Sequence, residues 1–273
     1  MNHAIELERP LTERRRKIDR RGSVSPRLVE ELASAIEQDG IEVLFQPQFD
    51  CESGQIAGAE ALLRWSHSER GLLSGDRVFA LAREGALSKR LTRHLCDRAM
   101  AAATAWPSGF RLSLNAMAED LADPDYPGTL LECLRDSGFP ASRLTLEITE
   151  QALVDSLDTA AKLLRPVADA GIAIALDDFG AGFCNFRYLK MLPLSALKLD
   201  RSMVEGIATD RQDLAVFRGI LAMARALDLR VIAEGVETES QRAAVCREGC
   251  DIWQGFLGSR PISAPEFAEF AAV

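Results

Sequence analysis

An α/β barrel is the fold class that this sequence of 273 residues predicts, on three observations. The length and the apolar content of 47% suit one large globular domain rather than two small ones. Strand-like apolar runs alternate with helical spacing along most of the chain, which favours parallel strands covered by helices. About eight strands over about 250 residues is the size of a (β/α)8 barrel.

The first predicted elements are a helix and a hairpin. Leucines, an alanine and an isoleucine at helical spacing predict a helix over residues 26–38, which Gly40 ends. Two strand-like runs follow, at 41–49 and 56–63. The short connection between them, at 52–55, contains a glycine and favours an antiparallel hairpin.

From residue 76 the predicted helices and strands alternate. Helical stretches are expected over about 76–104, and helices at about 127–138, 156–170, 211–228 and 239–248, with a short helix before residue 196 and a last one from about residue 264. The strands are expected at 110–115, 143–150, 172–178, 196–200, 231–237 and 251–255.

Polar side chains recur where these strands end. Asp177 and Asp178 directly follow the apolar run 172–176, and a lone Asp pair of this kind is typical of a helix cap. The pattern repeats at the other strand ends, with Asn115, Glu147, Lys198, Asp200, Glu234 and Gln254. In a parallel barrel these ends share one rim, so the set as a whole predicts one pocket.

The chemistry of this set indicates a cation site. At least four carboxylates beside an amide need cations to stay charged and close together. The three histidines, His3, His67 and His94, are far apart in sequence, so we expect oxygen ligands and hard ions such as Mg²⁺ or Mn²⁺. Two such ions about 3.5–4 Å apart suit attack of water on a phosphodiester. Lys198 could orient or deprotonate that water.

Composition excludes other classes and predicts the compartment. The net charge of −9 argues against a nucleic-acid polymer as partner. No apolar run approaches the ~18 residues of a membrane span and the start does not resemble a signal peptide, so we expect a cytoplasmic protein. The polar, basic residues 1–24 are expected to form a flexible arm. Six scattered cysteines are expected to be free thiols: Cys51, Cys96, Cys133, Cys184, Cys246 and Cys250.

Several motifs resemble those of the EAL-domain phosphodiesterases. They are EALLRW at 60–65, DDFG at 177–180, LKLD at 197–200, EGVE at 234–237, FQP at 45–47, EITE at 147–150 and QGF at 254–256. The resemblance runs from about Ile41 to Phe267, within a domain placed at 25–273. It implies a modified TIM (β/α)8 barrel whose first strand runs antiparallel to the others. It also implies metal-dependent hydrolysis of cyclic di-GMP to linear pGpG, a homodimer and a possible regulatory protein partner.

The resemblance also implies roles for individual residues. The metal ligands would be Glu60, Asn115, Glu147 and Asp177, with Asp178 on the second of two Mg²⁺ or Mn²⁺ ions and Glu234 orienting bound water or a ligand. Lys198 would be the general base or would position water, and with Glu60 and Glu234 it forms the catalytic set. Glu150 would tether the loop after Asp178. The substrate-binding residues would be Gln46, Leu63, Arg64, Asp200, Glu237 and Gln254.

The departures from the family pattern are modest. Residues 181–185 read AGFCN where the family usually has TGYSS, which puts regulation and rate in question. No departure removes a ligand, and we expect His67 to be structural and Cys184 to be a packing substitution. Two alternatives stay open: a catalytically silent EAL module that binds cyclic di-GMP or a protein partner and relays a signal, and an interaction scaffold.

Overall fold

The computed structural model describes residues 25–153, 157–182 and 186–271. The predicted N-terminal arm and the prediction for Cys184 therefore lie outside the described residues. Within the described ranges, no helix is long and apolar enough to cross a membrane.

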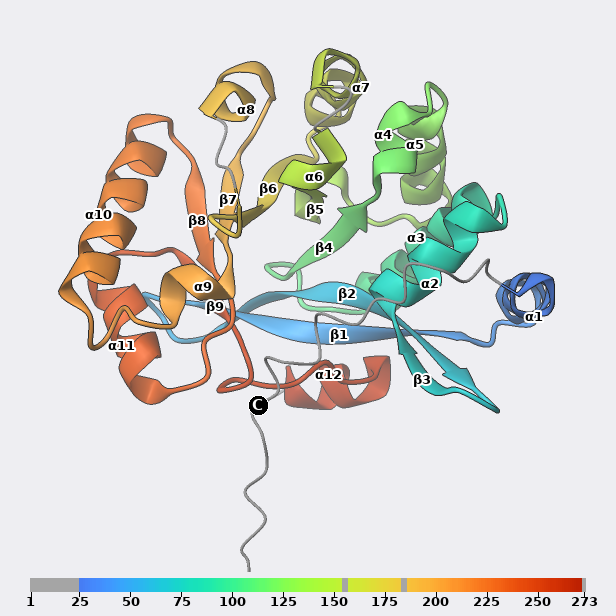
Figure 1. The fold of residues 1–273 in the computed structure, drawn as a ribbon, viewed down its shortest axis with the longest axis horizontal. Helices are drawn as coiled ribbons and strands as arrows, with labels where there is room; N and C mark the ends of the chain where they lie inside the picture. The colour runs from blue at the N-terminus through green and yellow to red at the C-terminus, as the bar shows by residue number, and fades with distance from the viewer. Residues whose placement is uncertain (1–24, 154–156, 183–185, 272–273) are drawn as a thin grey trace, which may run out of the picture.

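Eight strands close into a barrel (Figure 1). The strands run in the order β1-β9-β8-β7-β6-β5-β4-β2, and pairing of β1 with β2 closes the ring. β1 is antiparallel to both neighbours and all other pairs in the ring are parallel, so the predicted fold class is confirmed. The strands are β1 (Ile41–Asp50), β2 (Ile56–His67), β4 (Arg111–Ala116), β5 (Leu144–Thr149), β6 (Ala173–Phe179), β7 (Ala196–Leu199), β8 (Arg230–Ala233) and β9 (Ile252–Gln254).

A ninth strand, β3 (Gly71–Ser74), extends β2 as an antiparallel hairpin outside the ring. The sequence analysis did not predict it. With only four residues and a single partner, it offers too little alternation to be distinguished from a turn.

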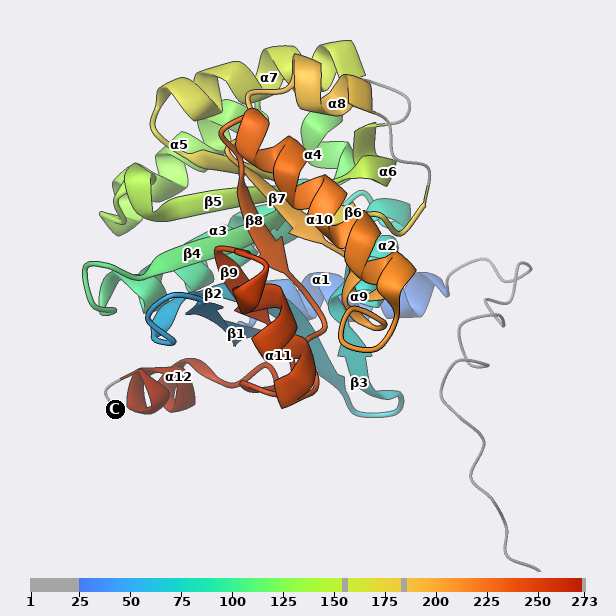
Figure 2. The same ribbon diagram turned by 90° about the vertical axis from the view of Figure 1, so that its left-hand side faces the viewer.

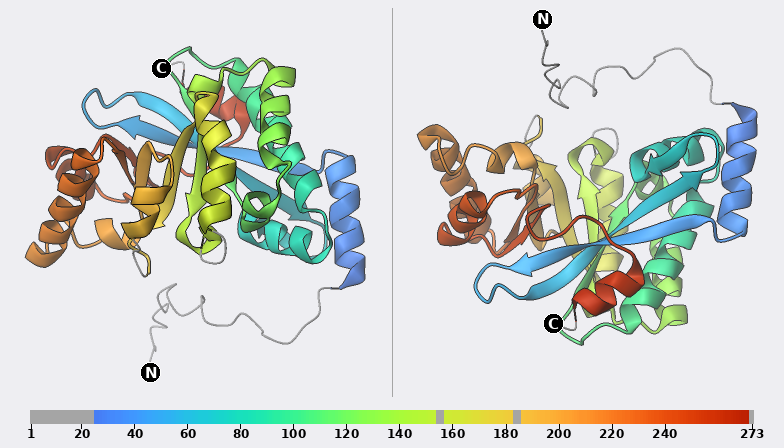
Figure 3. Two further views of the ribbon diagram at one scale, coloured as in Figure 1. Left: turned by 90° about the horizontal axis from the view of Figure 1, so that it is seen from above. Right: turned by 90° about the horizontal axis from the view of Figure 1, so that it is seen from below.

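Helices surround the barrel, and the views from the side and from above show them outside the strands (Figures 2 and 3). Helix α12 packs on β1, where Phe267 meets the rings of Phe45 and Trp106. The helices are α1 (Pro26–Glu37), α2 (Gly75–Glu84), α3 (Ser88–Thr104), α4 (Ala118–Ala122), α5 (Tyr126–Ser137), α6 (Glu150–Leu153), α7 (Leu157–Asp169), α8 (Phe186–Met191), α9 (Arg201–Val204), α10 (Arg211–Ala226), α11 (Glu239–Arg247) and α12 (Ala264–Phe270).

The helical stretches predicted at 76–104 are two helices, α2 and α3. Ala86, between α2 and α3, has a φ of 55°, in the left-handed region that an α-helix does not use. Propensity does not reveal such a break, because alanine is a strong helix former.

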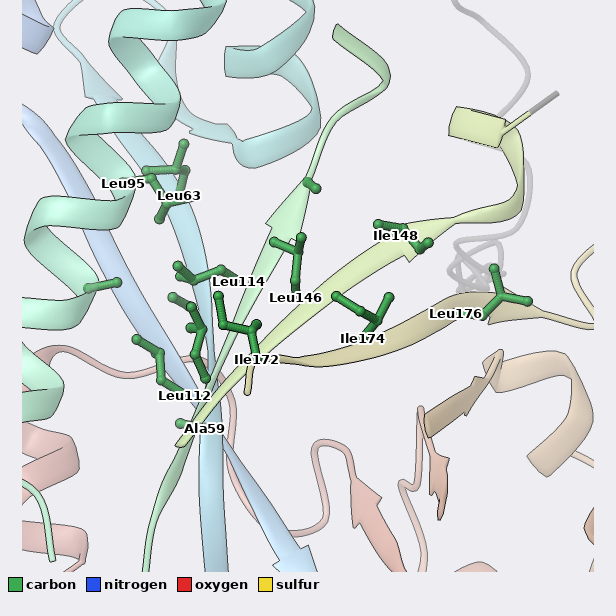
Figure 4. Packing of buried hydrophobic residues seen from close by; sticks show 14 of the residues in the cluster. Ala59, Leu63, Leu95, Leu112, Leu114, Leu146, Ile148, Ile172, Ile174 and Leu176 are labelled. Carbon is green, nitrogen blue, oxygen red and sulfur yellow. The ribbon is translucent and has the colours of Figure 1, made fainter. Parts of the chain in front are cut away.

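The main core lies between the strands and the helices, and it explains why the strands read as apolar runs (Figure 4). Alternate residues of β4, β5 and β6 point outward into this layer: Leu112, Leu114, Leu146, Ile148, Ile174 and Leu176. Inside the barrel a smaller apolar layer is formed by Ala175, Ala196, Ile232 and Ile252. Polar side chains occupy the inward positions beyond this inner layer, and they form the site described below.

His67 has the structural surroundings that the sequence analysis expected. Its imidazole is buried at the end of β2 and its Nε2 lies 2.9 Å from Oε2 of Glu31 in α1. The ring also meets Trp65 edge to face. These contacts tie α1, which lies at the edge of the molecule in Figure 3, to the barrel.

The expectation of free thiols is wrong for one pair of cysteines. Cys51 and Cys246 form a disulfide, with Cα atoms 5.0 Å apart and a sequence separation of 195. Pairing of β1 with β9 brings them together, since Cys51 N donates to Asp251 O at 2.9 Å. Because this pairing joins opposite ends of the chain, the spacing of the cysteines in the sequence gave no sign of it. Cys96, Cys133 and Cys250 are buried and free.

Candidate active site

Side chains from seven strands converge at the carboxyl end of the parallel strands. The register aligns Asn115 of β4 with Glu147 of β5, and Thr149 of β5 with Asp177 of β6. Parallel pairing thus places the ends of successive strands on one rim, as the sequence analysis predicted. The side chains that hydrogen-bond or ion-pair with one another there are Glu60, Asn115, Glu147, Asp177, Lys198, Glu234 and Gln254.

Lys198 is the centre of this cluster. Its side chain is 1% exposed, and its Nζ lies 2.5 Å from Glu147 Oε2, 3.1 Å from Asp177 Oδ2 and 3.5 Å from Glu60 Oε2. Nζ also lies 2.6 Å from Glu234 Oε1, an ion pair without the directionality of a hydrogen bond. One ammonium group therefore faces four carboxylates.

The electrostatics of the cluster keep Lys198 protonated. Burial by itself would lower the pKa of Lys198, but the carboxylates of Asp177, Glu147, Glu234 and Glu60 outweigh it and raise that pKa well above its ordinary value. Burial by itself would raise the pKa of Glu60, yet Lys198 and hydrogen bonds from Asn115 and Gln254 hold it below its ordinary value. Glu60 is thus an anion at neutral pH.

Burial and mutual repulsion make the charged form of the other carboxylates in the cluster less favourable. Burial raises the pKa of Glu147 to about 8. The positive charge of Lys198 lowers this pKa, whereas the negative charges of Glu60 and Asp177 raise it further. Burial is also the first cause that raises the pKa of Asp177 and of Glu234. Glu147 Oε1 is buried and has no hydrogen-bond partner among the described residues. An orphaned carboxylate oxygen in a surplus of negative charge is a ready ligand for a cation.

A group of three carboxylates has the spacing of a metal site. One oxygen from each of Asp177, Asp178 and Glu234 lies within 4.8 Å of the others. Asp178 has a φ of 56°, unusual for a residue other than glycine, and its backbone N–H donates to Asp177 Oδ1 at 2.8 Å. Burial and the charges of Asp177 and Asp200 raise the pKa of Asp178 to about 6. An all-oxygen set of this kind fits hard divalent cations.

Amide side chains support one side of the cluster. Asn115 Nδ2 donates to Glu60 Oε1 at 2.7 Å, and Gln254 Nε2 donates to Glu60 Oε2 at 2.8 Å. Gln254 Nε2 also reaches Gln46 Oε1 at 3.1 Å, and Gln254 Oε1 accepts from Gln48 Nε2 at 2.9 Å. Both oxygens of Glu60 are thereby held in place.

A cavity of 530 Å³ opens over the cluster. Leu63, Arg64 and Asp200 of the predicted substrate-binding set line it, with Arg64 as the only Lys or Arg among its described lining residues. The cavity also exposes the metal-ligand candidates Glu60, Asn115, Asp177 and Asp178. Its walls thus combine apolar side chains, one guanidinium and a floor of carboxylates.

The other predicted residues lie around this cavity rather than in its lining. Gln46 and Gln254 are buried among the amides, and Glu237 is held by Arg201, whose Nη1 lies 2.7 Å from Glu237 Oε1. Glu150 begins α6, and burial followed by the charge of Asp178 raises its pKa. Its Oε1 is buried without a partner among the described residues, and residues 183–185 of the loop that it was predicted to tether are not described.

Sequence reasoning missed several residues of this region. Gln48 was not selected, although it follows Gln46 by two positions and therefore shares its face of β1. That alternation was the available signal. Most of the missed cavity-lining side chains come from helices and loops whose approach to the rim only the fold reveals: Phe79, Leu95, Met117 and Gln151. Thr149, also missed, ends β5.

Comparison with known proteins agrees with this geometry. The family model described as EAL domain matches residues 29–261. The chain is 35% identical over 245 residues to cyclic di-GMP phosphodiesterase NbdA of Pseudomonas aeruginosa, covering 88% of this chain and 31% of NbdA. It is 33% identical over 243 residues to MucR of the same organism, a bifunctional diguanylate cyclase/cyclic di-GMP phosphodiesterase, covering 88% of this chain and 36% of MucR. The chain thus spans about a third of the length of these curated relatives.

Solved structures have the same fold. A PaMucR phosphodiesterase in complex with c-di-GMP superposes with a TM-score of 0.81 and 32% identity, covering 88% of this chain and 99% of that one. An EAL domain protein from Listeria monocytogenes gives a TM-score of 0.80 and 26% identity, covering 92% and 99%. The barrel with its antiparallel β1 is therefore shared with EAL domain structures.

Proposed function

Because the chain belongs to the EAL domain family, we propose that it is a metal-dependent phosphodiesterase that hydrolyses cyclic di-GMP to linear pGpG. The observation that carries the proposal is the buried cluster in which four carboxylates share one lysine at the floor of a 530 Å³ cavity. The relatives support the substrate, since NbdA is a cyclic di-GMP phosphodiesterase and the PaMucR structure contains c-di-GMP.

In this proposal the carboxyl-end cluster holds two Mg²⁺ or Mn²⁺ ions. The ligands are Glu60, Glu147, Asp177, Asp178, Glu234 and the side-chain carbonyl of Asn115, whose amide nitrogen is already engaged by Glu60. When bound, such ions activate water and neutralise charge on the phosphoryl oxygens. The orphaned oxygen of Glu147 and the surplus of carboxylates support this assignment.

The protein's own residues orient and hold the reactants. Lys198 Nζ reaches the carboxylates of Glu60, Glu147, Asp177 and Glu234, so we assign it the positioning of water and the balancing of charge. Glu234, at the solvent side of the cluster, orients the attacking water. Arg64 binds a phosphate, because a guanidinium matches phosphate geometry, and Leu63 contacts a guanine base.

Further substrate contacts are assigned to the amides and acids around the cavity. Gln46 and Gln254, which hydrogen-bond with each other, form the polar surroundings of the bound substrate. Asp200 lines the cavity, and Glu237 lies outside the lining, paired with Arg201. The homodimer, the regulatory partner and the cytoplasmic location stay predictions. Sedimentation of the purified chain with and without cyclic di-GMP would test the first of them.

The experiment that tests the function is a hydrolysis assay on cyclic di-GMP with Mg²⁺ or Mn²⁺. The proposal predicts pGpG that appears only with metal, and Glu60→Gln should lower the rate by more than about 100-fold, since it removes a direct ligand rather than an outer-shell partner. A chelated sample is the control, and a parallel titration measures nucleotide binding. Tight binding of cyclic di-GMP without turnover would instead identify the silent EAL module. A chain that neither binds nor hydrolyses cyclic di-GMP would contradict the phosphodiesterase and the silent nucleotide-binding module alike.

A further inference from the structure

Gln48 belongs to a directed chain of amide hydrogen bonds that ends on Glu60. Its Nε2 donates to Gln254 Oε1 at 2.9 Å, and Gln254 Nε2 donates to Glu60 Oε2 at 2.8 Å. Gln48 is 3% exposed and Gln254 is 4% exposed, so water does not supply these bonds. The residues lie far apart in sequence, and the pairing of β1 with β9 aligns them.

The contacts of the Gln254 amide set the direction of this series of bonds. Its NH₂ group lies 2.8 Å from Glu60 Oε2 and 3.1 Å from Gln46 Oε1, both of which accept. Its carbonyl oxygen then faces away from Glu60 and needs a donor. Gln48 supplies that donor, and without it the amide of Gln254 would lose a buried partner and could turn over.

The position of Gln48 on β1 is fixed by both neighbouring strands. It pairs with Gly58 of β2 on one side and with Gln254 of β9 on the other. Its backbone is therefore held in register on both sides.

We propose that Gln48 is a positioning residue that fixes the Gln254 amide, and through it the orientation of Glu60, for cation binding. The inference rests on the proposed function in so far as Glu60 is a metal ligand. With Asn115 on Oε1 and Gln254 on Oε2, both Glu60 oxygens are oriented before a cation arrives. Outer-shell partners of this kind typically change metal affinity by about 10–100-fold.

The first test measures Mn²⁺ affinity by electron paramagnetic resonance. Gln48→Met removes the donor at nearly constant volume and should weaken binding at least about tenfold. Gln55→Met, at an exposed position of the same hairpin, should have no effect. Wild-type affinity in Gln48→Met would overturn the proposal.

The second test needs no metal, and so separates this inference from the proposed function. In chelator, the effect of Gln48→Met on the unfolding equilibrium is measured alone and together with Glu60→Gln. In Glu60→Gln, the new glutamine can donate to Gln254 Oε1 once the Gln254 amide has turned over. The loss in free energy of unfolding caused by Gln48→Met should therefore be at least about threefold smaller in Glu60→Gln than in wild type. If the effects of Gln48→Met and Glu60→Gln on unfolding were additive, Gln48 would not act on Glu60 through Gln254. That result would overturn the proposal even in a protein that binds no Mn²⁺.

Discussion

The two ends of the barrel carry different polar groups on the same strands. On β4, Arg111 lies at the amino end and Asn115 at the carboxyl end, on the same face of the strand. On β8, Arg230 precedes Glu234, which directly follows the strand, by the same four positions. The apolar inner layer separates these ends: Ala175, Ala196, Ile232 and Ile252.

The ends differ in how water reaches their charges. Arg111 and Arg230 are only partly buried, and neither forms an ion pair within the described residues. Burial and the charge of Arg230 lower the pKa of Arg111, whose Nε lies 3.5 Å from Thr145 Oγ1. At the carboxyl end, by contrast, Lys198 and Glu147 are out of contact with water. Like charges can lie close together where water screens them. The buried carboxylates at the carboxyl end outnumber their one lysine, and they need bound cations to be charged together.

The ends also differ in what holds them together. The Cys51–Cys246 disulfide lies at the amino end, because β1 is antiparallel and its last residue pairs with the first residue of β9. At the carboxyl end the strands are instead linked by the ion pairs of Lys198 and by the hydrogen bonds of Asn115 and Gln254 to Glu60. The amino end is thus held by a covalent bond, and the carboxyl end by charged groups that depend on one another.

The largest expected effect tests the role of Lys198. Lys198→Met leaves four buried carboxylates without their countercharge and should destabilise the chelated protein by about 3–5 kcal/mol in urea unfolding. Mn²⁺ should recover more stability in this variant than in wild type, because the ions supply positive charge. Lys162→Met, at an exposed position, is the matched control. A chelated Lys198→Met protein as stable as wild type would show that the cluster is not under electrostatic stress.

Reduction of the disulfide should have the next largest effect. It closes a long loop, and its loss should lower the free energy of unfolding by about 2–4 kcal/mol. The measurement is urea unfolding with and without dithiothreitol. The Cys51→Ser/Cys246→Ser variant should match the reduced wild type and ignore the reductant. A reductant effect of equal size in that variant would place the change elsewhere.

The pH dependence of metal binding sharpens the comparison at the carboxyl end. Glu147, with a pKa of about 8 in the metal-free protein, holds a proton below that pH and must release it to bind a cation. Mn²⁺ affinity should therefore rise by up to about tenfold per unit from pH 6 to 8 and level off above. Titrations at several pH values check this, and Glu147→Gln should flatten the slope. An affinity that falls with rising pH would contradict the assignment.

The smallest effect is expected at the amino end. Arg111→Met removes one of two neighbouring like charges that are partly open to water, so the free energy of unfolding should change by less than about 1 kcal/mol. Metal affinity should equal that of wild type. Urea unfolding and Mn²⁺ titration of the variant measure both, and a large loss of either would mean that the two ends are coupled through the inner layer.

The sequence predicts the barrel and the acidic cluster because both follow from local patterns. Apolar runs that end in Glu147 or Asp177 need only parallel pairing to meet. Features that depend on contacts between distant parts of the chain were not predictable. Gln48 meets Gln254, 206 residues away, and Cys51 meets Cys246 only because β1 closes against β9. The break at Ala86 depends on a backbone angle that its residue type does not favour.

The central claim is that the buried charge surplus at the carboxyl end is a site for divalent cations. Counting bound Mn²⁺ by electron paramagnetic resonance, in wild type and in Asp177→Asn, tests it most directly. The account predicts two ions per wild-type chain and fewer in the variant, with the folded structure retained by circular dichroism. A wild-type chain that binds none at millimolar Mn²⁺ would contradict it.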